Sequence, residues 1–143
     1  MGKKRIVKKG GESEGSKGSA SSVRSGKRRL ESGTLFVEAT YNNTKVSLAD
    51  QGGNIVTWSS AGSLGFSGAK KGTPFAAAKV GELIGERGTA MGLKEVGVVV
   101  KGVGAGRESS IRAFATKGIG INSIKDVTPV PWNGPKPPKP RRV

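Results

Sequence analysis

The end of the chain, residues 129–143, contains six of its seven prolines. Proline fixes φ and has no backbone N–H, so this segment can form neither a helix nor a central strand. The same segment contains four basic residues and no acidic residue; the basic residues are Lys136, Lys139, Arg141 and Arg142. We therefore expect an extended cationic arm, which loses little entropy when it lies along a polyanion such as a nucleic-acid backbone.

Positive charge is concentrated at both ends of the chain. The net charge is +15, of which residues 1–30 carry +8, residues 31–128 carry +3 and residues 129–143 carry +4. A nearly balanced body with two basic arms indicates nucleic-acid binding, because each Lys or Arg that meets a phosphate releases condensed counterions. The alternative is solvated surface charge that only aids solubility.

The composition excludes several classes of site. There is no cysteine and no histidine, which removes disulfides, thiolate metal sites, the commonest general base and the commonest metal ligand. No apolar run approaches membrane-spanning length, and no apolar stretch follows the charged N-terminus as in a signal peptide. We expect a cytoplasmic protein without a metal, a cofactor or a membrane partner.

The length of 143 residues fits one domain. Residues 1–32 are rich in Gly, Ser, Lys and Arg, so we expect a basic N-terminal extension that is disordered when free. Residues 33–128 are expected to form a globular α/β domain, and residues 129–143 the proline-rich basic tail.

Five segments are predicted to be strands: 34–41, 45–50, 55–60, 95–101 and 119–127. The first shows strand alternation, with Leu35, Val37, Ala39 and Tyr41 on one face. In the fourth, the consecutive valines 98–100 favour burial on both faces of the sheet. Trp58, in the third, is expected to be half-buried in the core.

Two helices are predicted between these strands. Thr73 and Pro74 indicate the start of the first, as N-cap and first helical residue. Glycines 81, 85 and 88 weaken this helix and are explained if they allow it to pack closely on the sheet. The second helix is expected at 107–117. The order βββαβαβ predicts a mixed sheet flanked by two helices.

The segment 102–109 is the strongest local motif, because its glycines stand between a strand and a helix. Backbone N–H groups at Gly104 and Gly106 could approach a phosphate that Arg107 also contacts. An ordinary tight turn, with Glu108 serving the helix dipole or pairing with Arg107, is an equal alternative. A P-loop is excluded, and a dinucleotide fingerprint fails at Arg107, where it requires glycine.

Two further segments carry candidate contacts. The hairpin Asn42-Asn43-Thr44 is either an RNA-contacting tip or an ordinary turn, and residue chemistry alone favours the turn. Trp132 lies among prolines with no core of its own, so it could stack on a base or fill a protein pocket. The Asn133-Gly134 pair favours a tight turn in the tail.

Many short motifs occur together in one order: Asn42-Asn43-Thr44, Gly52-Gly53-Asn54, Thr73-Pro74-Phe75-Ala76-Ala77, Gly106-Arg107-Glu108-Ser109, Asp126-Val127-Thr128-Pro129, Asn133-Gly134 and the Arg-Arg-Val end. In these motifs the chain resembles the family of ribosomal protein eleven of the small subunit, from about residue 33 to the end. The resemblance implies a ribonuclease H-like fold used without catalysis. It also implies a non-enzymatic, RNA-binding ribosomal protein of the translation machinery.

The resemblance further implies a place on the platform of the small ribosomal subunit. There the protein would bridge helices of the small-subunit rRNA and contribute to the cleft that holds the Shine–Dalgarno pairing of messenger RNA. Ribosomal proteins seven and eighteen would be its neighbours. The alternative is a free-standing, metal-dependent nucleic-acid enzyme of ribonuclease H-like fold, which would need carboxylates clustered around metal ions. The strand acids Glu38, Asp50 and Asp126 show no clear cluster.

The RNA-contacting residues expected from these arguments fall in four segments, and no catalytic residue is expected. The expected residues are Asn42, Asn43, Thr44, Lys70, Lys71, Gly104, Gly106, Arg107, Trp132, Asn133, Gly134, Lys136, Lys139, Arg141 and Arg142.

Overall fold

A computed structural model describes residues 29–142. It contains five strands, two α-helices and one short 3-10 helix. In chain order these are β1 (Ser32–Ala39), β2 (Thr44–Ala49), β3 (Ile55–Ser60), η1 (Gly68–Gly72), α1 (Pro74–Ala90), β4 (Glu95–Gly102), α2 (Gly106–Ala115) and β5 (Gly120–Asp126). The predicted βββαβαβ order and its mixed sheet are confirmed, and η1 lies between the third strand and the first helix.

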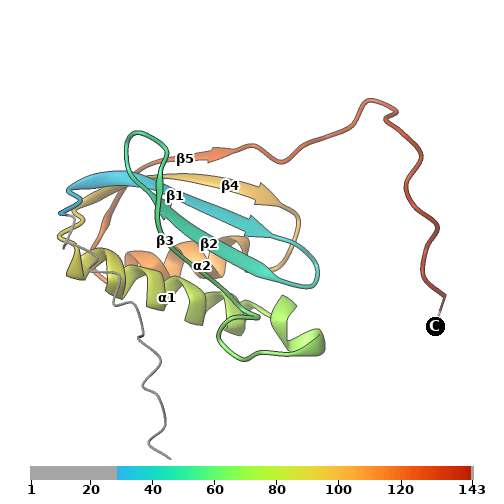
Figure 1. The fold of residues 1–143 in the computed structure, drawn as a ribbon, viewed down its shortest axis with the longest axis horizontal. Coiled ribbons are helices and arrows are strands. Elements are labelled where there is room, and N and C mark those ends of the chain that lie inside the picture. The colour runs from blue at the N-terminus through green and yellow to red at the C-terminus, as the bar shows by residue number, and fades with distance from the viewer. Residues whose placement is uncertain (1–28, 143) are drawn as a thin grey trace, which may run out of the picture.

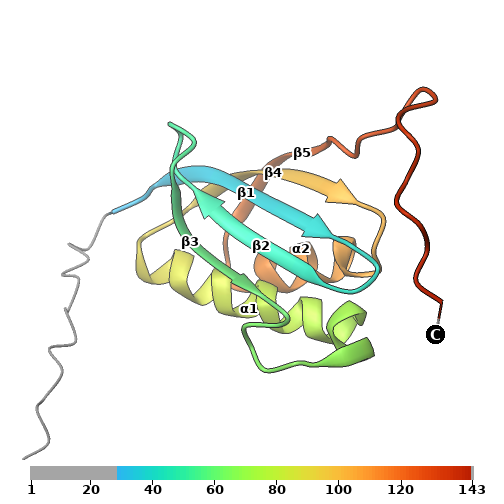
Figure 2. The same cartoon turned by 45° about the vertical axis from the view of Figure 1, so that its right-hand side comes forward.

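The five strands form one sheet in the order β3-β2-β1-β4-β5. β1, β2 and β3 pair antiparallel, and β4 and β5 continue from β1 in parallel. Both helices lie on the same face of this sheet, as the two views in Figures 1 and 2 agree. No helix of residues 29–142 lies over the opposite face, so this part of the chain forms two layers.

The core lies between the sheet and the helices. Alternate residues of β1, including Leu35 and Val37, are fully buried there against Ile84 of α1 and Phe114 of α2. The alternation predicted for β1 stops at Ala39, where the strand ends, and Tyr41 is exposed in the turn that follows. Burial of apolar area on one face of the sheet therefore sets the register of the strands.

The prediction that β4 is buried on both faces is wrong. Val96, Val98 and Val100 point into the core, but Val99 is only half-buried. The reason is that both crossover helices cover the same face of the sheet.

The two helices are held at close range by glycine. A Cβ on Gly81 of α1 would lie 2.3 Å from the carbonyl oxygen of Ser110 in α2. Gly85 similarly faces Lys117, at the end of the α2 segment, while Gly88 lies near Leu48 of β2. Gly81 and Gly85 thus bring α1 close to the α2 segment and not to the sheet. A Cβ on Gly88 would meet Leu93 and Ile119 first and Leu48 of β2 only at 3.7 Å, an ordinary contact distance.

The ends of the described chain differ in how they are held. The Leu30 N–H donates to the Met91 carbonyl oxygen at 3.0 Å, so the chain is anchored just before β1. The expected disordered extension lies mostly outside the described residues. Residues 127–142 contain no helix or strand and run away from the sheet (Figure 1). Within residues 29–142, no helix is long and apolar enough to span a membrane.

Candidate nucleic-acid interface

Four segments that are far apart in the sequence meet at one end of the sheet. We call this region the cationic end and define it as the turn 40–43, η1, the loop 103–105 and the tail from residue 127. Two glycines allow three of these segments, namely the turn, η1 and the loop, to approach closely. A Cβ on Gly72 would lie 2.2 Å from the Tyr41 carbonyl oxygen, and a Cβ on Gly104 would lie 2.2 Å from the Thr40 carbonyl oxygen. The turn, the loop and the tail lie at the right-hand side of Figure 2.

The turn 40–43 uses one of its two asparagines internally. The Thr40 N–H donates to the Asn43 carbonyl oxygen at 2.9 Å, and the Asn43 side-chain oxygen accepts from the Thr44 N–H at 3.0 Å. Asn42 and Tyr41 are left exposed at the tip. The exposed surface of this turn is therefore an amide and a phenol, both able to contact a base or a phosphate.

Thr44, the third residue of the predicted RNA-contacting hairpin, is fully buried. Its hydroxyl has no hydrogen-bond partner within the described residues and lies against Gly106, where a Cβ would be 2.1 Å away. Gly104 and Gly106 are buried as well. These three residues pack the loop against the turn, and their side chains and Cα atoms are not on the surface.

η1 presents the two lysines expected from the sequence. Lys70 is exposed, and Lys71 is half-buried with its stem close to Gly62. The carbonyl oxygen of Lys70 accepts a hydrogen bond of 2.7 Å from the Thr73 hydroxyl. That hydroxyl also caps α1 by accepting from the Ala76 N–H at 3.4 Å, which confirms the predicted helix start.

Arg107 holds the root of the tail. Its Nη2 atom lies 2.5 Å from an Asp126 carboxylate oxygen, and its Nη1 donates to the Thr128 hydroxyl at 3.1 Å and to the Gly102 carbonyl oxygen. Glu108, the partner weighed for Arg107 from the sequence, instead lies 3.9 Å from Arg112. We call Arg107, Asp126 and Thr128 the tail latch.

The tail latch lowers the pKa of Asp126 below its usual range. The largest cause is the hydrogen bond from the Thr128 hydroxyl, of 2.6 Å, followed by the one from Arg107. The Thr128 N–H adds a third donor, at 2.9 Å. The latch therefore fixes a carboxylate in its charged form and leaves the Arg107 guanidinium only partly open to solvent.

The tail beyond the latch is exposed. The four basic residues predicted to contact RNA are all on the surface, and Trp132 is 97% exposed. Asn133 has a φ of 54°, in the left-handed region that asparagine tolerates in turns, and the chain bends at this point. The tail therefore changes direction at Asn133, where the sequence predicts a tight turn.

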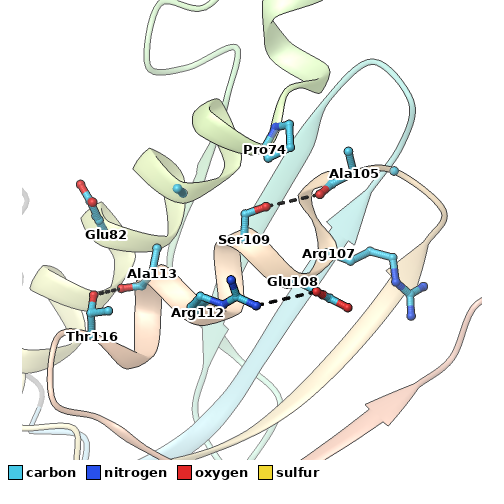
Figure 3. A pocket seen from close by; sticks show the side chains of 11 residues that line it. Pro74, Glu82, Ala105, Arg107, Glu108, Ser109, Arg112, Ala113 and Thr116 are labelled. Atoms are coloured by element: carbon cyan, nitrogen blue, oxygen red, sulfur yellow. Dashed lines mark hydrogen bonds and ion pairs between the residues drawn. The ribbon is translucent and has the colours of Figure 1, made fainter.

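A groove of about 660 Å³ runs between α1 and α2 beside the cationic end. Figure 3 shows Arg112 reaching Glu108 and the Ser109 hydroxyl donating to the Ala105 carbonyl oxygen, while Arg107 extends away from α1. Because Glu82 and Glu108 also line the groove, its charge is mixed and does not favour a phosphate.

Sequence reasoning missed the tail latch. A signal was present, because Asp-x-Thr is typical of a turn in which the aspartate accepts from the backbone two residues on. It gave no indication that Arg107 would be the third member. Tyr41 was also missed, since strand alternation assigned it to a face rather than to the turn.

Within residues 29–142, no three side chains of His, Cys, Asp or Glu come close enough together to hold a metal ion. The arrangement offers exposed cations, amides and an exposed indole, which are groups that can contact nucleic acid.

Comparison with known proteins gives the family. The sequence profile of ribosomal protein S11 matches residues 33–142. The small ribosomal subunit protein uS11 of Solibacter usitatus (strain Ellin6076) is 52% identical over 117 residues, covering 82% of this chain and 87% of that protein. The small ribosomal subunit protein uS11c of Chlorokybus atmophyticus is 51% identical over 121 residues, covering 85% and 93%.

The chain therefore belongs to the ribosomal protein S11 family of the small ribosomal subunit. Members of this family are structural ribosomal proteins and not enzymes, so the predicted location in the ribosome holds and the nuclease alternative is set aside.

Proposed function

We propose that the cationic end binds small-subunit rRNA and bridges RNA helices on the platform of the subunit. The observation that carries this proposal is the meeting of the turn 40–43, η1 and the loop 103–105 at the point where the tail leaves the sheet. Contacts that are weak alone then share one rigid base, which reduces the entropy lost on binding. The tail extends the same surface toward a second RNA segment.

The residues predicted from the sequence divide between contact and support. Asn42 and Lys70, which are exposed, and Lys71, which is half-buried, are assigned direct contacts. The four cations of the tail are assigned phosphate contacts along a second helix, after the turn at Asn133 redirects the chain. Trp132 is assigned to a base or a protein pocket that immobilises it.

The buried residues support these contacts. Thr44, Gly104 and Gly106 hold the loop 103–105 against the turn. Arg107, which pairs with Asp126, is assigned to aim the tail, with at most one guanidinium edge left for a phosphate. Asn43 sets the shape of the turn through its internal hydrogen bonds.

Further parts of this proposal rest on the family resemblance. They are the ribonuclease H-like character of the fold, the contribution to the Shine–Dalgarno cleft with contact to messenger RNA, and the neighbours, ribosomal proteins seven and eighteen. The element order and the mixed sheet support the first of these.

The test is a hydroxyl-radical footprint on small-subunit rRNA with the double variant Lys70→Gln/Lys71→Gln. We expect lost protection at one RNA segment and a salt slope reduced by about 1.4–1.8, because each of the two phosphate contacts contributes about 0.7–0.9. Lys94→Gln is the control, since Lys94 is exposed next to the opposite end of β4. Unchanged protection in the double variant, or an equal loss in the control, would overturn the assignment.

A further inference from the structure

The face of the sheet that no helix of the described residues covers carries a continuous row of side chains across all five strands. Strand register places Phe36 of β1 opposite Ser47 of β2 and Val99 of β4. Ser47 lies opposite Trp58 of β3, and Val99 lies opposite Lys125 of β5. Neighbours in register share a face of the sheet, so these five residues define one row, which we call the open face.

Two aromatic rings of the open face are unusually exposed. Trp58 is 53% exposed and Phe36 is 36% exposed, although a sheet residue of this size is normally covered in a folded domain. Neither ring stacks on another aromatic ring within residues 29–142, where the ring pair found is Phe66 with Phe75. Ser47 lies buried between the two rings and forms the floor of the row.

Lysines line this row on one side and at one end. In the next row along the strands, Glu38 stands between Lys45 and Lys101. All three are exposed, and none of them is in an ion pair within the described residues. Lys125, also exposed, closes the aromatic row at β5. The side of the row nearer the cationic end is therefore net positive.

We propose that the open face binds a single-stranded RNA segment, with bases stacked on Phe36 and Trp58. The phosphates of this RNA segment lie near Lys45, Lys101 and Lys125. Aromatic side chains on an uncovered sheet are a recurrent platform for unpaired bases, because every base has a face that stacks. This inference rests on the proposed function and adds a second RNA surface, on a different side of the sheet from the helices.

The charge pattern favours RNA over a protein partner. The fully buried centre of a protein interface is depleted in lysine, and a protein covering Phe36 and Trp58 would also remove Lys45 and Lys101 from water. A polyanion gains from the same lysines. The strands of a sheet are about 4.8 Å apart, so the two rings stand about 10 Å apart and can receive separate bases.

The test uses the full chain with Trp132→Phe, in which Trp58 is the remaining tryptophan. We expect a single-stranded oligoadenylate to quench Trp58 fluorescence. Phe36→Leu should weaken this binding at least about fivefold, since base stacking contributes about 1–3 kcal/mol. Phe75→Leu is the control, because Phe75 is exposed on the helical side. The double variant Lys45→Gln/Lys101→Gln is a second test of this binding, and it leaves the buried core unchanged because both lysines are exposed.

Four outcomes separate the possibilities. Quenching by single strands and not by duplex RNA supports the proposal. No quenching, or equal quenching by duplex, overturns it, even if the variant still joins the small subunit and the proposed function stands. A Trp58 signal that changes only when other ribosomal proteins are added assigns the face to protein and also overturns it. Quenching in the variant, together with an unaltered chain that never joins the subunit, supports the open face and contradicts the proposed function.

Discussion

At the scale of single residues, the tail latch makes stability depend on pH. Asp126 has a lowered pKa because it accepts from Thr128 and Arg107, so the unfolded chain binds the proton more tightly than the folded one. The contribution of the Asp126 carboxylate to the free energy of unfolding is fully present above the ordinary aspartate pKa of about 3.9. It is lost as the pH falls below that value, toward the lower pKa of Asp126 in the folded chain.

The variant Asp126→Asn tests this directly. We expect a lower melting temperature than the unaltered chain at neutral pH, and a difference that shrinks as the pH falls below about 4. Thermal unfolding followed by circular dichroism at several pH values measures it. Glu108→Gln is the matched control, because Glu108 is highly exposed and its ion pair with Arg112 is long, at 3.9 Å. A difference that persists unchanged in acid would mean that Asp126 acts by shape and not by charge.

At the scale of elements, the contact between α1 and α2 depends on Gly81. Alanine is the better helix former by about 1 kcal/mol, yet its Cβ would lie 2.3 Å from the Ser110 carbonyl oxygen. We expect Gly81→Ala to lower the free energy of unfolding by about 1–3 kcal/mol, the usual cost of overpacking. Urea unfolding measures the change.

The comparison variant is Gly85→Ala. Its Cβ would meet the Lys117 side chain first, at 2.7 Å, and a lysine side chain can move more readily than a helix backbone. We expect a smaller loss there. If Gly81→Ala is as stable as the unaltered chain, the two helices are not in close contact at this point.

The same elements show what the sequence determines. The Thr73-Pro74 pair predicts the start of α1, and alternation predicts that β1 exists and which face it buries, because this information is local. The residue that Gly81 faces cannot be predicted from the local sequence, because it depends on where α2 lies. The contact of Gly72 with the Tyr41 carbonyl has the same origin. Candidate contacts could thus be predicted one by one, but their meeting at the cationic end required the topology.

At the scale of the whole molecule, a nearly balanced body lies between two basic arms, and the C-terminal arm is held by one latch. The body from 31 to 128 carries only +3, while the tail from 129 to 143 carries +4. The latch joins β4, α2 and the tail through Gly102, Arg107 and Thr128. The direction of the tail is therefore set by the domain, while its affinity is set by its own charge.

This division predicts different effects for charge and for the latch. Replacing the four basic residues of the tail by glutamine should reduce the salt slope of rRNA binding by about 3, because each phosphate contact contributes about 0.7–0.9. Thr128→Val, which removes the latch hydroxyl, should keep the slope but blur the tail's footprint on rRNA. Lys117→Gln is the charge control, since Lys117 follows α2 at the end away from the tail and pairs with Glu86 at 3.0 Å. A slope that survives loss of all four tail charges would place the electrostatic affinity elsewhere in the chain. A sharp footprint in Thr128→Val would show that the RNA, rather than the latch, directs the tail.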